Sequence, residues 1–157
     1  MARKKKTEIS EPTVYTYEQL QKIEDHIEKH FGQIENYLQE SDTDDIKLNI
    51  YALPPTVNNR CLTLVTAGMG ALEMKVPDEL EDNKLSRCEL VMTLPPDWDI
   101  HGEELENVWP LHLLKLISRL PIKEKSWLGP YHTIDYGTCF ASNTEFTSIM
   151  IMPFSED

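Results

Sequence analysis

The stretch LVTAGMGALEM places Gly68 and Gly70 directly after a short apolar run, as in a strand that enters a phosphate-binding loop. A dinucleotide loop follows the pattern GxGxxG and opens a helix, whose amides and dipole hold the pyrophosphate. Here Glu73 occupies the third glycine position with a negative charge, and Pro77 leaves no room for a helix. We therefore predict a strand end or bulge around Met69, with no anion bound beside it.

Two further patterns are similar to metal sites. His26 and His30 are four residues apart, but the sequence HIEKH is not HExxH, and no third ligand follows at a suitable spacing. The run DTDD at 42–45 resembles the start of a calcium loop, which would need Gly at 47 and Glu at 53. Those positions are Lys47 and Leu53. We expect solvated histidines and a solvated acidic loop, with no metal or other cofactor.

A thiol nucleophile is the remaining catalytic candidate. Cys139, His132 and Asp135 lie in one irregular segment, and a nucleophile needs a base and an orienting group beside it. Nothing in the sequence makes these three converge, so we expect no enzyme, and a small Cys/His-dependent hydrolase stays as an alternative. The cysteines are three in number, widely spaced and without a CxxC pair. This usage favours reduced thiols and a cytoplasmic location.

Three tryptophans are candidates for a binding surface. Trp98, Trp109 and Trp127 lie next to prolines or in expected loops. Tryptophan buries a large area and is enriched at protein interfaces, which favours a contact role. An equally good interpretation is that they fix loops onto the core.

The elements that must position these residues follow from apolar periodicity. An amphipathic helix is expected over 17–31, with Thr16 and Gln19 as a capping box and Gly32 just past its end. A second helix is expected from Pro110, at its first helical position, to Pro121, which ends it.

The expected strands alternate apolar and polar residues. They cover 46–53 as a half-buried strand, 61–66 as its hairpin partner, 87–94, a short segment within 129–140, and 146–152. The acidic run 39–45 is expected to be a loop. Strands joined by turns, with one helix before them and one between, predict an α+β fold: a mixed, largely antiparallel sheet with flanking helices.

Length and composition indicate one domain with a strongly negative net charge. The 157 residues carry a net charge of −12, and residues 7–157 alone carry 11 basic and 27 acidic side chains, or −16. Such a surface repels nucleic acid and attracts a basic partner. No apolar run approaches the roughly 20 residues of a membrane span, so we expect no membrane binding. We expect residues 1–15 to be a flexible basic segment and residues 16–157 a single domain.

The order of several short motifs resembles one known family. IYALPPT, LTLVTAGMGALEMKVP, CELVMTLPPDW, WPLHLLKLISRLP, WLGPYHTI and IMIMP follow one another as in the suppressor-of-fused domain family, over about residues 20–153. The resemblance implies a mixed α/β domain that binds other proteins and has no established catalytic chemistry. Animal members carry a second domain and bind a zinc-finger transcription factor. Bacterial members usually stand alone and are often linked with toxin immunity.

The resemblance also implies a contact region. In animal members the partner peptide lies near an Arg-Tyr pair that ends the second helix and an Asp-His pair in the next loop. Arg119 and His132 match, whereas Leu120 and Tyr131 replace the Tyr and the Asp. The expected contact residues are Trp98, Trp109, Arg119, Trp127, Tyr131 and His132. Family members continue past IMIMP with another strand and an acidic segment, so a truncated chain and a domain without that edge element both stay open.

The function expected from these observations is protein binding, and specifically a bacterial immunity protein that neutralises a basic toxin domain by occlusion. Two alternatives to this function stay open: the Cys/His-dependent hydrolase and a general interaction scaffold without a toxin. The oligomeric state does not follow from the sequence.

Overall fold

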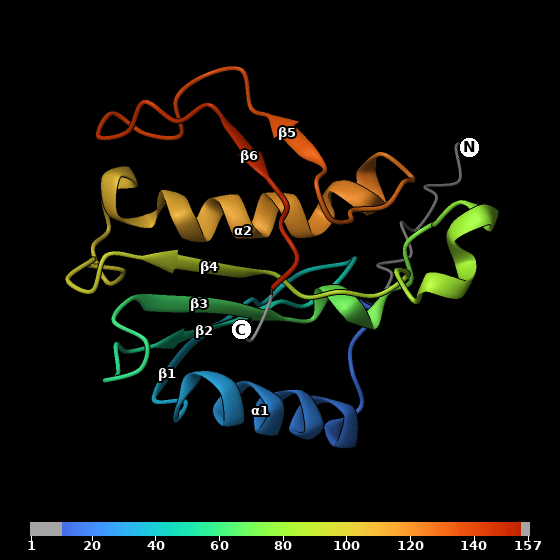
Figure 1. Cartoon of the computed structure of the whole chain (residues 1–157), viewed down its shortest axis with the longest axis horizontal. Helices are drawn as coiled ribbons and strands as arrows, with labels where there is room; N and C mark the ends of the chain where they lie inside the picture. Colours follow the sequence, from blue (N-terminus) through green and yellow to red (C-terminus); the bar gives the residue numbers. More distant parts are fainter. Residues whose placement is uncertain (1–10, 155–157) are drawn as a thin grey trace, which may run out of the picture.

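A computed structural model of the chain describes residues 11–154. Its main sheet is covered on one face by α1 (Tyr17–Phe31) and on the other by α2 (Leu105–Lys123) (Figure 1). The sheet contains β1 (Asn36–Gln39), β2 (Asn49–Leu53), β3 (Leu62–Ala67) and β4 (Val91–Leu94). Between β3 and β4 lie two short 3-10 segments, η1 (Met69–Ala71) and η2 (Asp78–Asn83).

The strands of the sheet lie in chain order, β1-β2-β3-β4, and each pair is antiparallel. A second, two-stranded sheet is formed by β5 (Thr133–Asp135) and β6 (Ser148–Met150), which lie across α2 from the main sheet (Figure 1). This arrangement confirms the expected α+β class with flanking helices.

The sheet buries both of its faces. On the α1 side Tyr51 and Val65 pack with Ile27, and on the α2 side Ile50 and Leu64 belong to the larger core that includes Leu114. All residues of β2 and β3 are buried. The expectation of a half-buried strand over 46–53 was therefore wrong, because a helix covers each face and the polar positions of the alternation are also enclosed.

The first helix is as predicted at both ends. The Thr16 hydroxyl accepts from the Gln19 amide, the Gln19 side chain accepts from the Thr16 amide, and Gly32 ends the helix with a φ of 103°. These bonds satisfy backbone groups that the first and last turns leave without helical partners. Because they involve residues close in sequence, the pattern alone was sufficient to predict them.

The second helix differs from its predicted bounds. Both Pro110 and Pro121 lie inside it, whereas they were expected to begin and end it. A proline in a helix leaves the carbonyl four residues earlier without its amide partner. For Pro110 that carbonyl belongs to Glu106, and it accepts a hydrogen bond from the Asn143 side chain at 2.9 Å. A contact from a distant loop thus compensates the missing bond.

Two more strand predictions need correction. The strand β1 was not predicted, since all four of its residues are exposed and show no apolar alternation. The strand expected over 87–94 is shorter, because β4 begins only at Val91. Before it, the Leu90 carbonyl still accepts from the Thr66 amide of β3, while the Glu89 side chain turns to the site described below.

Residues 1–10 of the expected N-terminal segment lie outside the described residues. Residues 11–15 contact the domain: the Thr13 amide donates to the Asp45 carbonyl, and the Tyr15 hydroxyl donates to Glu89. None of the helices within 11–154 is long and apolar enough to cross a membrane.

Candidate protein-binding surface

The glycine turn after β3 holds a carboxylate of the chain itself. The amides of Gly68 and Gly70 donate to Glu89 Oε1 at 2.8 and 2.9 Å, and Tyr15 donates to the same oxygen at 2.7 Å. Thr66 donates to Glu89 Oε2 at 2.7 Å. The prediction of a strand end around Met69 is confirmed, since β3 ends at Ala67 and residues 69–71 form a 3-10 turn directly after it. What the sequence did not predict is that the amides of this turn bind a carboxylate of the chain itself.

Burial shifts the pKa values of three side chains at this turn. Burial raises the pKa of Glu89, although the four hydrogen bonds oppose the shift. Burial, followed by the charge of Glu89, raises the pKa of Tyr15 as well. The same two causes raise the pKa of the Cys88 thiol to about 11, which disfavours the thiolate.

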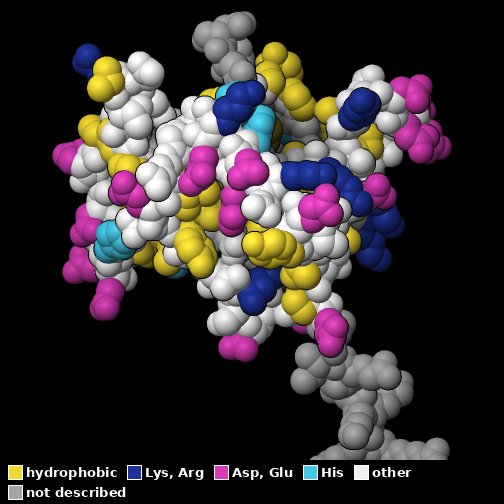
Figure 2. All heavy atoms as spheres, turned by 90° about the horizontal axis from the view of Figure 1, so that it is seen from below, with side chains coloured by type: hydrophobic (Ala, Val, Ile, Leu, Met, Phe, Trp, Pro, Cys, Tyr) yellow, Lys and Arg dark blue, Asp and Glu magenta, His cyan; other side chains and the backbone are white. Residues whose placement is uncertain are grey.

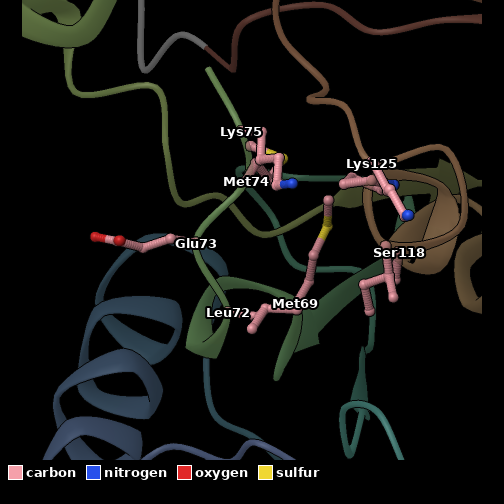
Figure 3. A pocket seen from close by; sticks show the side chains of 9 residues that line it. Met69, Leu72, Glu73, Met74, Lys75, Ser118 and Lys125 are labelled. Atoms are coloured by element: carbon pink, nitrogen blue, oxygen red, sulfur yellow. The ribbon is translucent and has the colours of Figure 1, made fainter. Parts of the chain in front are cut away.

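A small pocket with a volume of about 230 Å³ lies behind the turn, and the Glu73 side chain points away from it (Figure 3).

Among the described residues the candidate metal ligands and the candidate catalytic residues make other contacts. Within residues 11–154 no group of three or more His, Cys, Asp or Glu side chains could hold a metal ion. Asp45 of the acidic loop instead binds Arg119. In the same part of the chain no hydrogen bond joins Cys139, His132 and Asp135. His132 Nδ1 accepts from the Gly129 amide, and Asp135 accepts from the Gly137 amide and the Ser148 hydroxyl.

Arg119, an expected contact residue, lies inside the fold. Its guanidinium binds Glu40 at 2.9 Å and Asp45 at 3.0 Å, and its side chain is 13% exposed. Burial lowers the pKa of Arg119, but the two carboxylates together outweigh it and raise the pKa. The arginine therefore fastens α2 to the connection between β1 and β2. In this position it supports the fold and offers little surface to a partner.

Two of the tryptophans form a cluster near the N-terminal end of α2. The rings of Trp98 and Trp109 meet edge to face with centroids 5.9 Å apart, and Trp109 stacks on Phe140 at 5.4 Å. The Trp98 indole donates to the Asn107 carbonyl at 2.9 Å. Both indoles pack against the core. This geometry matches the interpretation that they fix loops onto the core.

The other three expected contact residues lie together beyond the C-terminal end of α2. The rings of Trp127 and His132 meet at 4.5 Å, and Tyr131 is 66% exposed between them in sequence. Tyr131 has a φ of 69°, in the left-handed region, and its amide donates to the Ile151 carbonyl. We call residues 127–132 the aromatic corner.

Next to this corner lies a groove that we did not predict. It has a volume of about 490 Å³ and runs between β4 with the segment before it and the end of the chain after β6. Its lining includes Val91 and Thr93 on one side, Pro130 at the corner, and Met150 and Met152 on the other. We call it the C-terminal groove. Met150, Met152 and Phe154 are each more than half exposed.

A signal for this groove was present in the run IMIM at 149–152. A strand with one buried face needs an apolar residue only at every second position. Ile149 and Ile151 pack against the core, so Met150 and Met152 are the apolar surplus that faces outward. The structure thus brings Trp127, Tyr131 and His132 to one apolar region and places Trp98, Trp109 and Arg119 elsewhere.

Comparison with known proteins agrees with the resemblance seen in the motifs. The family described as Suppressor of fused protein (SUFU) matches residues 44–157, more than half of the chain. An "Uncharacterized protein UU111" of Ureaplasma parvum serovar 3 is 31% identical over 101 residues, which cover 64% of this chain and 48% of that protein. The chain thus spans about half the length of this curated relative. No solved structure matches. The chain belongs to the suppressor of fused family, a family of protein-interaction domains.

Proposed function

We propose that this domain neutralises a basic protein, such as a toxin domain, by covering the surface through which that protein acts. The observation that carries the proposal is the excess of acidic side chains in a protein-interaction domain. Residues 11–154 contain 24 Asp and Glu against 11 Lys and Arg, a net charge of −13. Such a charge accelerates encounter with a basic partner and does not by itself fix the complex.

Apolar anchors must then hold the partner after encounter. The aromatic corner and the C-terminal groove provide them, since Tyr131, Met150 and Met152 are exposed and adjacent. Aromatic and methionine side chains are enriched at the centres of interfaces, where water is excluded. In this proposal the acidic surface brings the partner in and the corner retains it. The domain acts in the cytoplasm, where its three free cysteines stay reduced.

A protection assay tests the proposal. The chain is produced in the source cell together with each protein encoded next to it, and growth and co-purification are measured. We expect one toxic neighbour whose toxicity the chain suppresses and which it retains. Tyr131→Ala should weaken retention at least tenfold, whereas Tyr17→Ala, the control at an 83% exposed tyrosine of α1, should not. Absence of protection against every neighbour, together with absence of a toxic protein in the co-purified fraction, would contradict the proposal.

A further inference from the structure

The strand β1 has one edge without a partner among the described residues. The Glu40 amide donates to the Leu48 carbonyl, so the groups of residues 36, 38 and 40 point toward β2. The amides and carbonyls of Tyr37 and Gln39 therefore point outward, and no backbone bond within 11–154 uses them. Such an edge is a template for another strand.

An acidic groove lies along this edge on the α1 side of the sheet. It has a volume of about 460 Å³, and its floor includes Tyr37 and Tyr51, whose ring centroids are 5.7 Å apart. Three carboxylates of α1 line it, those of Glu24, Asp25 and Glu28. Figure 2 looks onto this side of the molecule and shows Asp and Glu side chains spread among hydrophobic ones, with several Lys and Arg side chains on the same face. No lysine or arginine lines the groove.

The opposite face of the same edge is mainly apolar. A pocket of about 230 Å³ lies there, and its lining includes Leu38, Ile50 and Leu111, with Asn36 and His101 as its polar members. Side chains of a strand alternate between the two faces of a sheet. A strand added beside β1 would thus place every second side chain near the carboxylates and the others at the apolar pocket.

We propose that β1 pairs with an extended segment of the partner in which Lys or Arg alternates with apolar residues. The inference rests on the proposed function for the basic character of the partner. Main-chain bonds to Tyr37 and Gln39 supply register, the carboxylates of α1 select the basic positions, and the apolar pocket selects the residues between them. Charge complementarity names this occupant, since a second copy would place the acidic grooves of two molecules against each other.

The probe is a synthetic peptide of alternating Lys and Val. It is added to the isotope-labelled full chain at low ionic strength, and amide shifts and hydrogen exchange are followed by NMR. We expect the amides of Tyr37 and Gln39 to shift and to become protected from exchange. A peptide of the same composition with all lysines before all valines, and one with Glu in place of Lys, should each bind at least tenfold more weakly.

Two substitutions in the chain test the charge and the edge separately. Asp25→Lys should weaken the alternating peptide about tenfold, because an attraction becomes a repulsion. Asp25 makes no ion pair or hydrogen bond within 11–154, so its replacement costs no internal contact. The matched control Glu79→Lys, in η2 away from β1, should change the affinity less than twofold. Gln39→Pro removes an outward amide only, so it should abolish binding and leave the melting temperature unchanged.

Several outcomes overturn the inference. The inference fails if the alternating peptide and the peptide with all lysines first bind equally well. It also fails if the amide shifts are confined to other surfaces, or if Gln39→Pro binds the alternating peptide normally. A peptide of residues 1–10, which contains Arg3 and Lys4, can be added as a competitor. If it binds more tightly than the alternating probe, the occupant of the edge is the chain's own segment and the inference of a partner fails. If the domain protects against a toxin while Gln39→Pro still protects, this inference fails and the proposed function stands. If the peptide binds β1 but no toxic neighbour exists, the proposed function fails and the inference about the β1 edge stands.

Discussion

At the scale of single residues, Glu89 fixes the conformation of the glycine turn after β3. Its carboxylate accepts hydrogen bonds from Tyr15, Thr66, Gly68 and Gly70, which come from the N-terminal segment, β3 and the turn after it. One buried acid thus joins three parts of the chain. The arrangement uses the same backbone amides that bind phosphate in nucleotide enzymes, but the anion belongs to the fold.

The raised pKa of Glu89 gives a prediction for stability against pH. Because burial raises its pKa above the ordinary value near 4.5, the folded chain holds this proton at pH values where the unfolded chain has lost it. The contribution of Glu89 to the free energy of unfolding is therefore full below the ordinary value and is lost as pH rises through the raised one. The slope is at most about 1.4 kcal/mol per pH unit.

Glu89→Gln isolates this effect, because glutamine keeps the shape and cannot ionise. We expect the unfolding free energy of the wild type minus that of the variant to fall as pH rises above 4.5. Urea denaturation at a series of pH values measures it. A difference that rises with pH would show that the four hydrogen bonds outweigh burial.

At the scale of elements, the turn after β3 depends on a close approach of backbones. A Cβ on Gly68 would lie 2.2 Å from the Lys47 carbonyl oxygen, and Gly68 has a φ of 139°. We expect Gly68→Ala to lower the unfolding free energy by about 3 kcal/mol or more, since it combines backbone strain with a clash. Gly137→Ala is the matched control: it has a φ of 85° but nothing within 4 Å, so about 1 kcal/mol is expected. Equal losses in urea denaturation would show that the contact with Lys47 is unimportant.

Elements defined by local signals were predictable, and those defined by distant contacts were not. The cap residues and stripe of α1 lie within one stretch of sequence, so the helix was found with both ends. The strand β1 exists because it pairs with β2, which no pattern within its exposed residues encodes. The α2 helix continues through Pro110 because Asn143, far along the chain, binds the carbonyl that the proline leaves free.

The candidate site shows the same division. Motif matching singled out Arg119, but only the fold shows that Glu40 and Asp45 enclose it. Trp98 and Trp109 were named for their residue type, and their packing against Phe140 and the core was not visible in the sequence. Tyr131 was named by its place in the motif order and is exposed. The groove beside it needed the juxtaposition of β4 and residues 150–154.

At the scale of the whole molecule, charge acts at long range and apolar contact only at short range, and this difference in range has kinetic consequences. Acidic side chains line the β1 edge, whereas exposed apolar side chains gather at the aromatic corner and the C-terminal groove. Long-range charge acts on diffusional encounter and is screened by salt, with a Debye length of about 10 Å at 0.1 M. Buried apolar anchors act after encounter and govern dissociation.

The proposed complex should therefore respond differently to salt and to substitution at the corner. Raising the salt concentration from 0.05 to 0.5 M should lower the association rate constant about tenfold or more and change the dissociation rate constant little. Tyr131→Ala should raise the dissociation rate constant and change the association rate constant little. The reason is that it removes a 66% exposed anchor without changing the charge. Surface plasmon resonance with the captured partner measures both constants. An association rate constant insensitive to salt would mean that the charge of −13 over residues 11–154 serves solubility and does not steer binding.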